Sequence, residues 1–266
     1  MELHDFNFKK KYGQNFLNDI TIPRKIVACA DIKEDSLVIE IGPGAGIMTK
    51  LLACNENVKQ VLAYEIDETL EDILAENLVG IDNVDIIYDD FLNRNIKDDL
   101  KKYNYKNLYV VANLPYYITT PIIMKIIEEG LNIEKVVIMI QKEVADRFGA
   151  VPKSKEYSSI TVFLNYYFDI KKEFTVSRNL FTPKPNVDSM VISLNKKHDK
   201  YDIKDKNLFF KVVRDSFKYK RKTLRNNLKG YDLDKVSNVL SKYHLDLSVR
   251  AEALPIEVFI DISNNL

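Results

Sequence analysis

The chain has 266 residues, of which 46% are hydrophobic and 29% are charged, enough for one core of ordinary size and a small second one. It contains no apolar run near the roughly 20 residues that a membrane-spanning helix needs, and its polar start does not resemble a signal sequence. The 39 basic and 39 acidic residues cancel, so the overall charge gives no indication of a polyanionic partner. These features predict a cytoplasmic protein and exclude an integral membrane protein.

Apolar runs rich in Val and Ile recur in the first half of the chain and predict buried strands. They lie at 37–41, 60–66, 84–88, 108–112 and 135–140. Amphipathic stretches such as 68–78 and 120–129 alternate with them, a pattern typical of a parallel sheet with right-handed crossovers. We therefore predict an α/β fold built on a Rossmann-like sheet.

The pattern changes after residue 158. Two β-like runs, 159–168 and 188–194, flank a loop with two prolines and predict an antiparallel hairpin that closes the sheet. A polar segment, 195–206, is followed by helical periodicity at 208–217, 233–243 and 256–262. The predicted domains are 1–195, which carries the sheet, and 196–266, a small helical domain.

A glycine loop, 40–46 (EIGPGAG), follows the first predicted strand and opens a helix. Gly42 and Gly44 allow the backbone to turn tightly and to approach a nucleotide-like cofactor. Glu65, 19 residues after Gly46, ends the second strand, where its carboxylate could accept both ribose hydroxyls; Ile66 is expected beside it. After the third strand, Asp89 or Asp90 could accept from an adenine amine, with Phe91 along the adenine face.

The tetrapeptide Asn113-Leu114-Pro115-Tyr116 follows the fourth strand, at the sheet edge where open α/β folds place ligands. An adenine amine is a poor nucleophile because its lone pair is delocalised into the ring. The Asn113 side-chain oxygen and the Leu114 carbonyl could each accept one N–H, which would localise that pair. Pro115 would fix the turn, and Tyr116 would stack on the base. Taken alone, the tetrapeptide fits a turn with a core tyrosine nearly as well. The glycine loop, the ribose acid, the adenine acid and the amine acceptors together favour methyl transfer to an adenine amine.

Five stretches together carry a family resemblance: 10–17 (KKYGQNFL), 40–46 (EIGPGAG), 113–121 (NLPYYITTP), 181–189 (FTPKPNVDS) and 220–228 (KRKTLRNNL). With them the chain resembles, over nearly its whole length, the KsgA/RsmA family of small-subunit ribosomal RNA adenine dimethyltransferases. The resemblance implies S-adenosylmethionine as methyl donor and dimethylation of N6 on two adjacent adenosines in the 3′-terminal hairpin of small-subunit RNA, during ribosome biogenesis.

The resemblance also implies roles for individual residues. Asn15 and Leu17 would contact the donor from an N-terminal segment, and Asn113 would face its methyl group. Asp90 rather than Asp89 would read the donor's adenine. Phe181 would stack on the target base opposite Tyr116. Tyr117 departs from the asparagine frequent in the family, so the role of this position is left open.

Between Lys211 and Lys229 lie eight basic residues and one acid, a net charge of +7 in a neutral chain. A charge run is more often a solvated helix face, but here we expect contacts with phosphates of the RNA. The family resemblance implies that the partner is small-subunit ribosomal RNA or a precursor of the small subunit, and we expect the protein to be a monomer. The residues expected to bind RNA are Lys218, Lys220, Arg221, Lys222 and Arg225.

Three other functions compete with this interpretation. An Erm-type enzyme would use the same chemistry on large-subunit RNA. A non-catalytic RNA-binding assembly or transcription factor could share the fold. A nicotinamide-dependent oxidoreductase would explain the glycine loop and Glu65 but not the tetrapeptide.

The two cysteines, Cys29 and Cys54, lie in helical patterns without a Cys or His partner at metal-ligand spacing. We expect both thiols to be buried and the protein to hold no metal.

Overall fold

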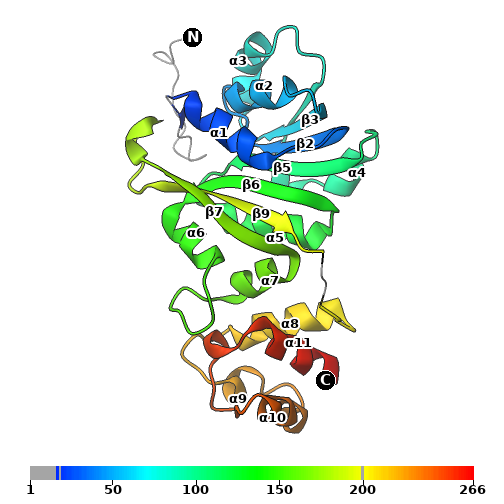
Figure 1. The fold of residues 1–266 in the computed structure, drawn as a ribbon, viewed down its shortest axis with the longest axis vertical. Helices are drawn as coiled ribbons and strands as arrows, with labels where there is room; N and C mark the ends of the chain where they lie inside the picture. The colour runs from blue at the N-terminus through cyan, green and yellow to red at the C-terminus, as the bar shows by residue number, and fades with distance from the viewer. Residues whose placement is uncertain (1–15, 18, 199–200) are drawn as a thin grey trace. The chain divides into compact units, whose positions relative to one another are not determined.

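The computed structural model describes residues 16–17, 19–198 and 201–266, and the chain divides into two compact units (Figure 1). The first unit comprises the described residues up to 145 together with 171–196. The second comprises 146–170 and 197–266. The chain leaves the first unit close to the predicted boundary at 195, whereas 146–170, which we assigned to the first domain, clusters with the C-terminal helices.

Five strands of the first unit pair in parallel in the order β4-β3-β2-β5-β6. They are β2 (Ser36–Ile41), β3 (Val58–Glu65), β4 (Val84–Tyr88), β5 (Asn107–Asn113) and β6 (Ile133–Gln141). Strand β2 lies in the middle and all six of its residues are buried, whereas β4 forms an edge and is only half-buried. This parallel pairing confirms the predicted Rossmann-like sheet. The apolar runs that predicted it show no alternation with polar residues, as expected of strands that are covered on both faces.

Helices precede, connect and follow these strands. They are α1 (Thr21–Ala30), α2 (Ile47–Ala53), α3 (Glu71–Asn77), α4 (Ile96–Leu100), α5 (Thr119–Glu129) and α6 (Lys142–Phe148), with short 3₁₀ turns η3 (Glu68–Leu70) and η4 (Phe91–Asn93). Helix α1 shows how the sequence directs the packing. Ile22, Ile26 and Ala30 recur at a spacing of four residues and are buried in the core, and the helix contacts β5 and β6.

A second set of strands completes the sheet. Strand β9 (Ser189–Lys196) pairs antiparallel with β6, and β7 (Phe168–Val176) lies outside β9. Between β7 and β9 the chain forms η5 (Arg178–Leu180) and β8 (Phe181–Thr182), and β8 pairs with β1 (Phe16–Leu17). Because β9 runs against β6, its first residue, Ser189, lies opposite Gln141, the last residue of β6. The 177–188 connection therefore reaches the edge where the parallel strands end.

The prediction of a strand at 159–168 was wrong. Residues 159–167 form α7 (Ser159–Tyr167), and the strand of the closing pair is β7 instead. The helix is buried on most sides, including Ile160, Phe163 and Tyr166, so its sequence lacks the polar stripe of an amphipathic helix. A capping box between Ser158 and Thr161 starts it.

The second unit is helical. Besides α7 it contains α8 (Lys206–Ser216), α9 (Leu224–Asn227), α10 (Leu233–Lys242), η6 (Ala251–Ala253) and α11 (Ile256–Asn265). Its core includes the fully buried rings of Phe163, Phe209 and Phe259. Asp205 and Asp232 cap α8 and α10 by accepting backbone N–H bonds. None of the helices described is long and apolar enough to cross a membrane.

The cysteine prediction was wrong in part. Both thiols are free, but Cys29 is only half-buried and Cys54 is exposed. Cys54 is the residue that follows α2, where the chain turns toward solvent.

Candidate functional site

One pocket of the first unit lies at the carboxyl ends of β2, β3, β4 and β5. Residues from all four strand ends meet there because parallel strands end at the same edge of a sheet. All the described residues predicted to bind the cofactor or the target base line it: Leu17, Gly42, Gly44, Glu65, Ile66, Asp90, Phe91, Asn113, Leu114, Pro115, Tyr116 and Phe181. Asn15 lies outside the described residues.

The glycine loop forms the floor of this pocket. Gly42 has a φ of +72°, and a Cβ at this position would meet no atom within 4 Å, so the space above it is open to a ligand. Gly46 has a different task. It precedes α2 with a φ of +82°, and a Cβ there would lie 3.1 Å from the Leu74 side chain of α3. Glycine at 46 therefore lets α2 and α3 pack closely, while Gly42 keeps the ligand side free.

Glu65 ends β3 and is 5% exposed. Its Oε2 accepts the Gly44 N–H at 3.1 Å and its Oε1 accepts the Asp67 N–H at 2.9 Å. Burial raises the pKa of the Glu65 carboxyl, and these two backbone hydrogen bonds oppose that shift. Each carboxylate oxygen has a second lone pair, so Glu65 can hold the glycine loop and still accept from the two hydroxyls of a ribose.

Glu40 is a site residue that the sequence analysis missed. It is fully buried in β2 and lines the pocket. Within the described part of the chain, neither oxygen of its carboxylate has a hydrogen-bond partner. Burial raises its pKa to about 8, and the nearby Glu65 adds to the shift. The available signal was an acid inside an otherwise apolar strand, because a carboxylate in a core needs a reason to be there.

The charges of the pocket indicate which ligand it suits. Its described lining contains four acidic side chains, Glu40, Glu65, Asp89 and Asp90, and no lysine, arginine or histidine. A dinucleotide would bring a pyrophosphate to these carboxylates with no cation to offset the repulsion. S-adenosylmethionine brings a sulfonium and an ammonium group, and opposite charges favour the ionised carboxylates. The residues present therefore fit S-adenosylmethionine and fit a nicotinamide dinucleotide poorly.

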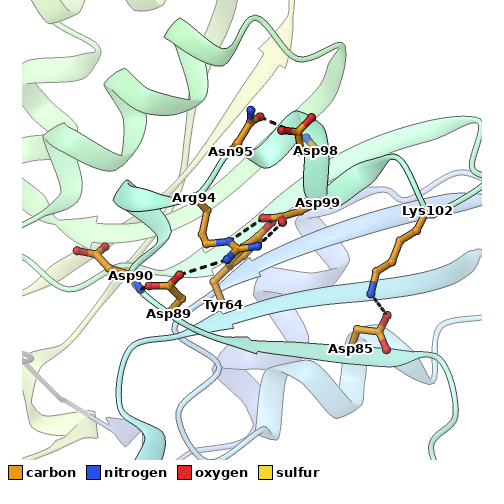
Figure 2. Close-up of polar contacts among 9 residues, drawn as sticks. All are labelled: Tyr64, Asp85, Asp89, Asp90, Arg94, Asn95, Asp98, Asp99 and Lys102. Carbon is orange, nitrogen blue, oxygen red and sulfur yellow. Dashed lines mark hydrogen bonds and ion pairs between the residues drawn. The ribbon is translucent and has the colours of Figure 1, made fainter.

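The structure separates Asp89 from Asp90 (Figure 2). Asp89 Oδ2 pairs with the Arg94 guanidinium at 3.3 Å, and its Oδ1 accepts the Asp90 N–H at 2.7 Å. Asp90 Oδ1 accepts the Leu92 N–H at 2.9 Å and starts η4. Arg94 also holds Asp99, which accepts a hydrogen bond from the Tyr64 hydroxyl. Because Arg94 occupies Asp89, Asp90 is the better placed of the two to accept from an adenine amine.

Asn113 is the last residue of β5, and Leu114 to Tyr116 form the turn before α5. The turn is fixed by the Leu114 N–H, which donates to the Met139 carbonyl at 3.1 Å, and by Ile118 N–H and Thr119 Oγ1, which donate to the Pro115 carbonyl. No hydrogen bond to another described residue occupies the Asn113 side-chain amide. Its oxygen is therefore available to a ligand in the pocket.

Two aromatic rings line the same pocket. Tyr116 is half-buried, burial raises the pKa of its hydroxyl, and that hydroxyl lies 2.7 Å from Ser189 Oγ. Phe181 pairs with Leu17 across β8 and β1 and is 4% exposed. It belongs to the hydrophobic core as well as to the pocket wall. Tyr117, next to Tyr116, is 56% exposed.

The basic segment lies in the second unit and spans the end of α8, a turn and α9. The Asn227 side chain organises the turn: its Nδ2 donates to the Ser216 carbonyl at 2.6 Å and to the Tyr219 carbonyl at 3.3 Å. The residues predicted to bind RNA are all exposed there: Lys218, Lys220, Arg221, Lys222 and Arg225.

The sequence matches the family described as "Ribosomal RNA adenine dimethylase" over residues 5–266. It is 44% identical to proteins named "Ribosomal RNA small subunit methyltransferase A" from Streptococcus gordonii and from Streptococcus pneumoniae serotype 2. In both alignments 100% of this chain and 94% of the relative are covered.

Two solved structures share the fold over nearly the whole length. A dimethyladenosine transferase from Plasmodium falciparum gives a TM-score of 0.76 at 25% identity and covers 93% of this chain and 95% of its own. The 23S rRNA methyltransferase ErmE gives a TM-score of 0.69 at 25% identity, and the alignment covers 94% of this chain and 99% of the ErmE chain. The arrangement of sheet and helices is therefore shared with a dimethyladenosine transferase and with a 23S rRNA methyltransferase.

Proposed function

The chain belongs to the ribosomal RNA adenine dimethylase family, and on that premise we propose that it dimethylates N6 of two adjacent adenosines in the 3′-terminal hairpin of small-subunit (16S) RNA. The methyl donor is S-adenosylmethionine. The reaction belongs to ribosome biogenesis, and we expect the enzyme to act as a cytoplasmic monomer on precursor small subunits.

The observation that carries this proposal is the joining of two different binding requirements in one pocket. The acidic side chains of the described lining, which includes no cation, suit a cationic nucleoside donor, and the same lining includes Asn113 and the rings of Tyr116 and Phe181, which suit an adenine with its amine. A binding protein would need neither an electrophile nor a free amide acceptor. An oxidoreductase would meet the first requirement only, with the opposite charge.

Each of the pocket residues named below has a defined task in the proposed reaction. S-adenosylmethionine supplies an electrophilic methyl group. Glu65 accepts hydrogen bonds from the ribose of the donor, and Asp90 accepts one from its adenine amine. Gly42, which has no side chain, leaves room for the donor to lie against the glycine loop. Asn113 Oδ1 and the Leu114 carbonyl each accept one N–H of the target amine, which directs the nitrogen lone pair out of the adenine ring.

We propose that Tyr116 and Phe181 hold the target adenine between their rings, and that the cations at 218–225 bind phosphates. Base stacking on one aromatic face contributes roughly 1 to 3 kcal/mol. No acid–base residue is needed, because the methylated amine becomes acidic and water can take its proton. In the second methylation only one N–H remains, so one of the two acceptors binds it.

The Erm-type alternative is favoured by the likeness to ErmE, but that structure is 25% identical, whereas the relatives named for the small subunit are 44% identical. The discriminating experiment offers undermethylated small subunits and naked large-subunit RNA to the enzyme with radiolabelled donor and maps the labelled nucleotides. We expect dimethyladenosine at the end of the small-subunit RNA. Label in large-subunit RNA would support the Erm type, and donor binding without label in either would support a non-catalytic factor.

A further inference from the structure

One hydrogen bond joins the pocket to the strand that closes the sheet. The Tyr116 hydroxyl lies 2.7 Å from Ser189 Oγ, a contact between residues 73 positions apart. Tyr116 follows β5, Ser189 begins β9, and β6 lies between these strands. The antiparallel direction of β9 brings Ser189 to the end of β6, opposite Gln141. The sheet topology therefore brings the Ser189 hydroxyl into contact with Tyr116, one of the two aromatic residues that line the pocket.

The contact has the properties of an anchor. Ser189 is fully buried and does not itself line the pocket. A buried hydroxyl without a partner is costly, so both groups favour staying together. The Tyr116 side chain has two torsions, and the hydroxyl oxygen lies on the axis of the second one. Holding this oxygen therefore fixes the first torsion, and with it the place of the ring in the pocket wall.

The start of β9 is itself fixed by hydrogen bonds, so Ser189 can hold the Tyr116 ring in place. The Lys142 N–H donates to the Asp188 carbonyl at 3.0 Å, which ties the strand to the end of β6. The Arg178 N–H donates to Asp188 Oδ1 at 2.9 Å, which ties the same point to the connection that carries Phe181. Residues 188–189 at the start of β9 therefore hold both the Tyr116 ring and the connection that carries the Phe181 ring.

We propose that Ser189 is a positioning residue for methyl transfer: it holds the Tyr116 ring at the place in the pocket wall where it stacks on the target adenine. The proposal rests on the proposed function, because it assumes that an adenine enters this pocket. Ser189 acts through Tyr116, touches neither donor nor base, and should influence turnover rather than donor binding.

The test uses the full chain and undermethylated small subunits, and compares Ser189→Ala, Tyr116→Phe and the double variant. Each single variant should lower kcat about 3- to 10-fold, the change expected from one ordinary hydrogen bond. Donor affinity, measured by calorimetry, should stay at the parent value. The double variant should be no slower than the slower single variant, because both changes remove the same bond.

A matched control comes from the same strand. Ser193 is also fully buried in β9, and its Oγ donates to Glu173 Oε1 at 2.6 Å, away from the pocket lining. Ser193→Ala should lower the free energy of unfolding as Ser189→Ala does but leave kcat unchanged. An equal loss of kcat in the control would show that β9 hydroxyls act only through stability and would overturn the proposal.

The remaining outcomes are also decisive. The proposal is overturned if Ser189→Ala keeps the parent kcat or if the effects of the two single variants multiply. Should Ser189→Ala fail to fold, Tyr116→Phe alone decides, because it retains the ring and removes the bond; a parent kcat would overturn the proposal. Failure of the proposed function is recognised separately, since the parent enzyme would then not methylate small subunits at all.

Discussion

At the scale of single residues, the proposed chemistry depends on an acceptor, the Asn113 side-chain oxygen, that no other described residue occupies. Asn113 ends a buried strand, and the turn after it is fixed by hydrogen bonds to its backbone, which leaves the side-chain oxygen for the substrate. A preorganised acceptor of this kind contributes most where charge develops in the transition state.

Asn113→Ala should therefore lower the single-turnover rate on the order of 100-fold or more while donor affinity stays close to that of the parent. Rapid-quench measurement of methyl transfer, with donor binding by calorimetry, checks this. Asn107→Ala is the matched control, because Asn107 begins the same strand and its side chain bonds to the Glu34 carbonyl. A near-parent rate for Asn113→Ala would remove Asn113 from the mechanism.

Glu40 gives a prediction about pH. The folded carboxyl has a pKa of about 8 against a usual 4.5, so between these values the folded state holds a proton that the unfolded state lacks. The free energy of unfolding should therefore fall as the pH rises from about 4.5 to 8, by at most about 5 kcal/mol, and change little above 8 from this group.

Glu40→Gln should remove that dependence. Without donor, the melting temperature of the variant should gain on that of the parent as the pH is raised from 5 to 8. Adding S-adenosylmethionine should stabilise the parent more than the variant, because the cationic donor favours the ionised carboxylate. A difference in melting temperature that is constant with pH would mean that Glu40 titrates normally.

At the scale of elements, short turns after the strands place the donor-binding carboxylates. Arg94 links Asp89, at the end of β4, to Asp99 in α4, and Asp89 in turn accepts the Asp90 N–H (Figure 2). The Tyr64 ring contacts Phe91 edge-on at 5.2 Å between centroids. The turn that carries Asp90 is thus held by the Asp89–Arg94 pair before it and by the Phe91–Tyr64 ring contact after it.

Arg94→Ala should loosen this turn and weaken donor binding about 3- to 10-fold, with little change in kcat at saturating donor, because a partly exposed ion pair contributes modestly. Calorimetry measures the affinity. Lys102→Ala is the control, since it breaks a neighbouring exposed pair, with Asp85, that is not linked to Asp90 (Figure 2). Equal donor affinity in both variants would contradict the role of Arg94.

At the scale of the whole molecule, a neutral chain has to bind a polyanion. The imbalance of +7 at 211–229 leaves the other residues with the opposite charge. The exposed cations of the second unit would attract phosphates, and the acidic remainder would discourage other binding modes. RNA binding should then depend on this local segment.

Replacing Lys220, Arg221 and Lys222 by Ala should weaken binding to undermethylated small subunits and reduce the slope of log affinity against log salt by about 2 to 3, at roughly 0.7 to 0.9 per lost phosphate contact. Donor affinity should not change. A triple variant of Lys97, Lys101 and Lys102, exposed cations of the first unit, loses the same charge and serves as control. Parent affinity and slope in the first triple variant would make the segment structural.

Local patterns in the sequence were sufficient to identify most of the sheet and most of the pocket. Strand β4 was predicted at its observed bounds, 84–88, because a short apolar run between turn residues indicates a strand without knowledge of its neighbours. Most pocket residues were found by the same means, because they lie at or after the ends of strands and parallel strands place their carboxyl ends together. Leu17 and Phe181 were instead expected from the family resemblance.

Tertiary structure decided what depends on partners distant in the sequence. Residues 159–167 are apolar on most sides, which suits a buried helix as well as a buried strand, and only their surroundings select the helix. Arg94 selects between Asp89 and Asp90 by pairing with one of them. The burial of Glu40 and the contact of Ser189 with Tyr116 arise from the order and direction of strands in the sheet, and strand order is a property of long-range pairing that no local pattern encodes.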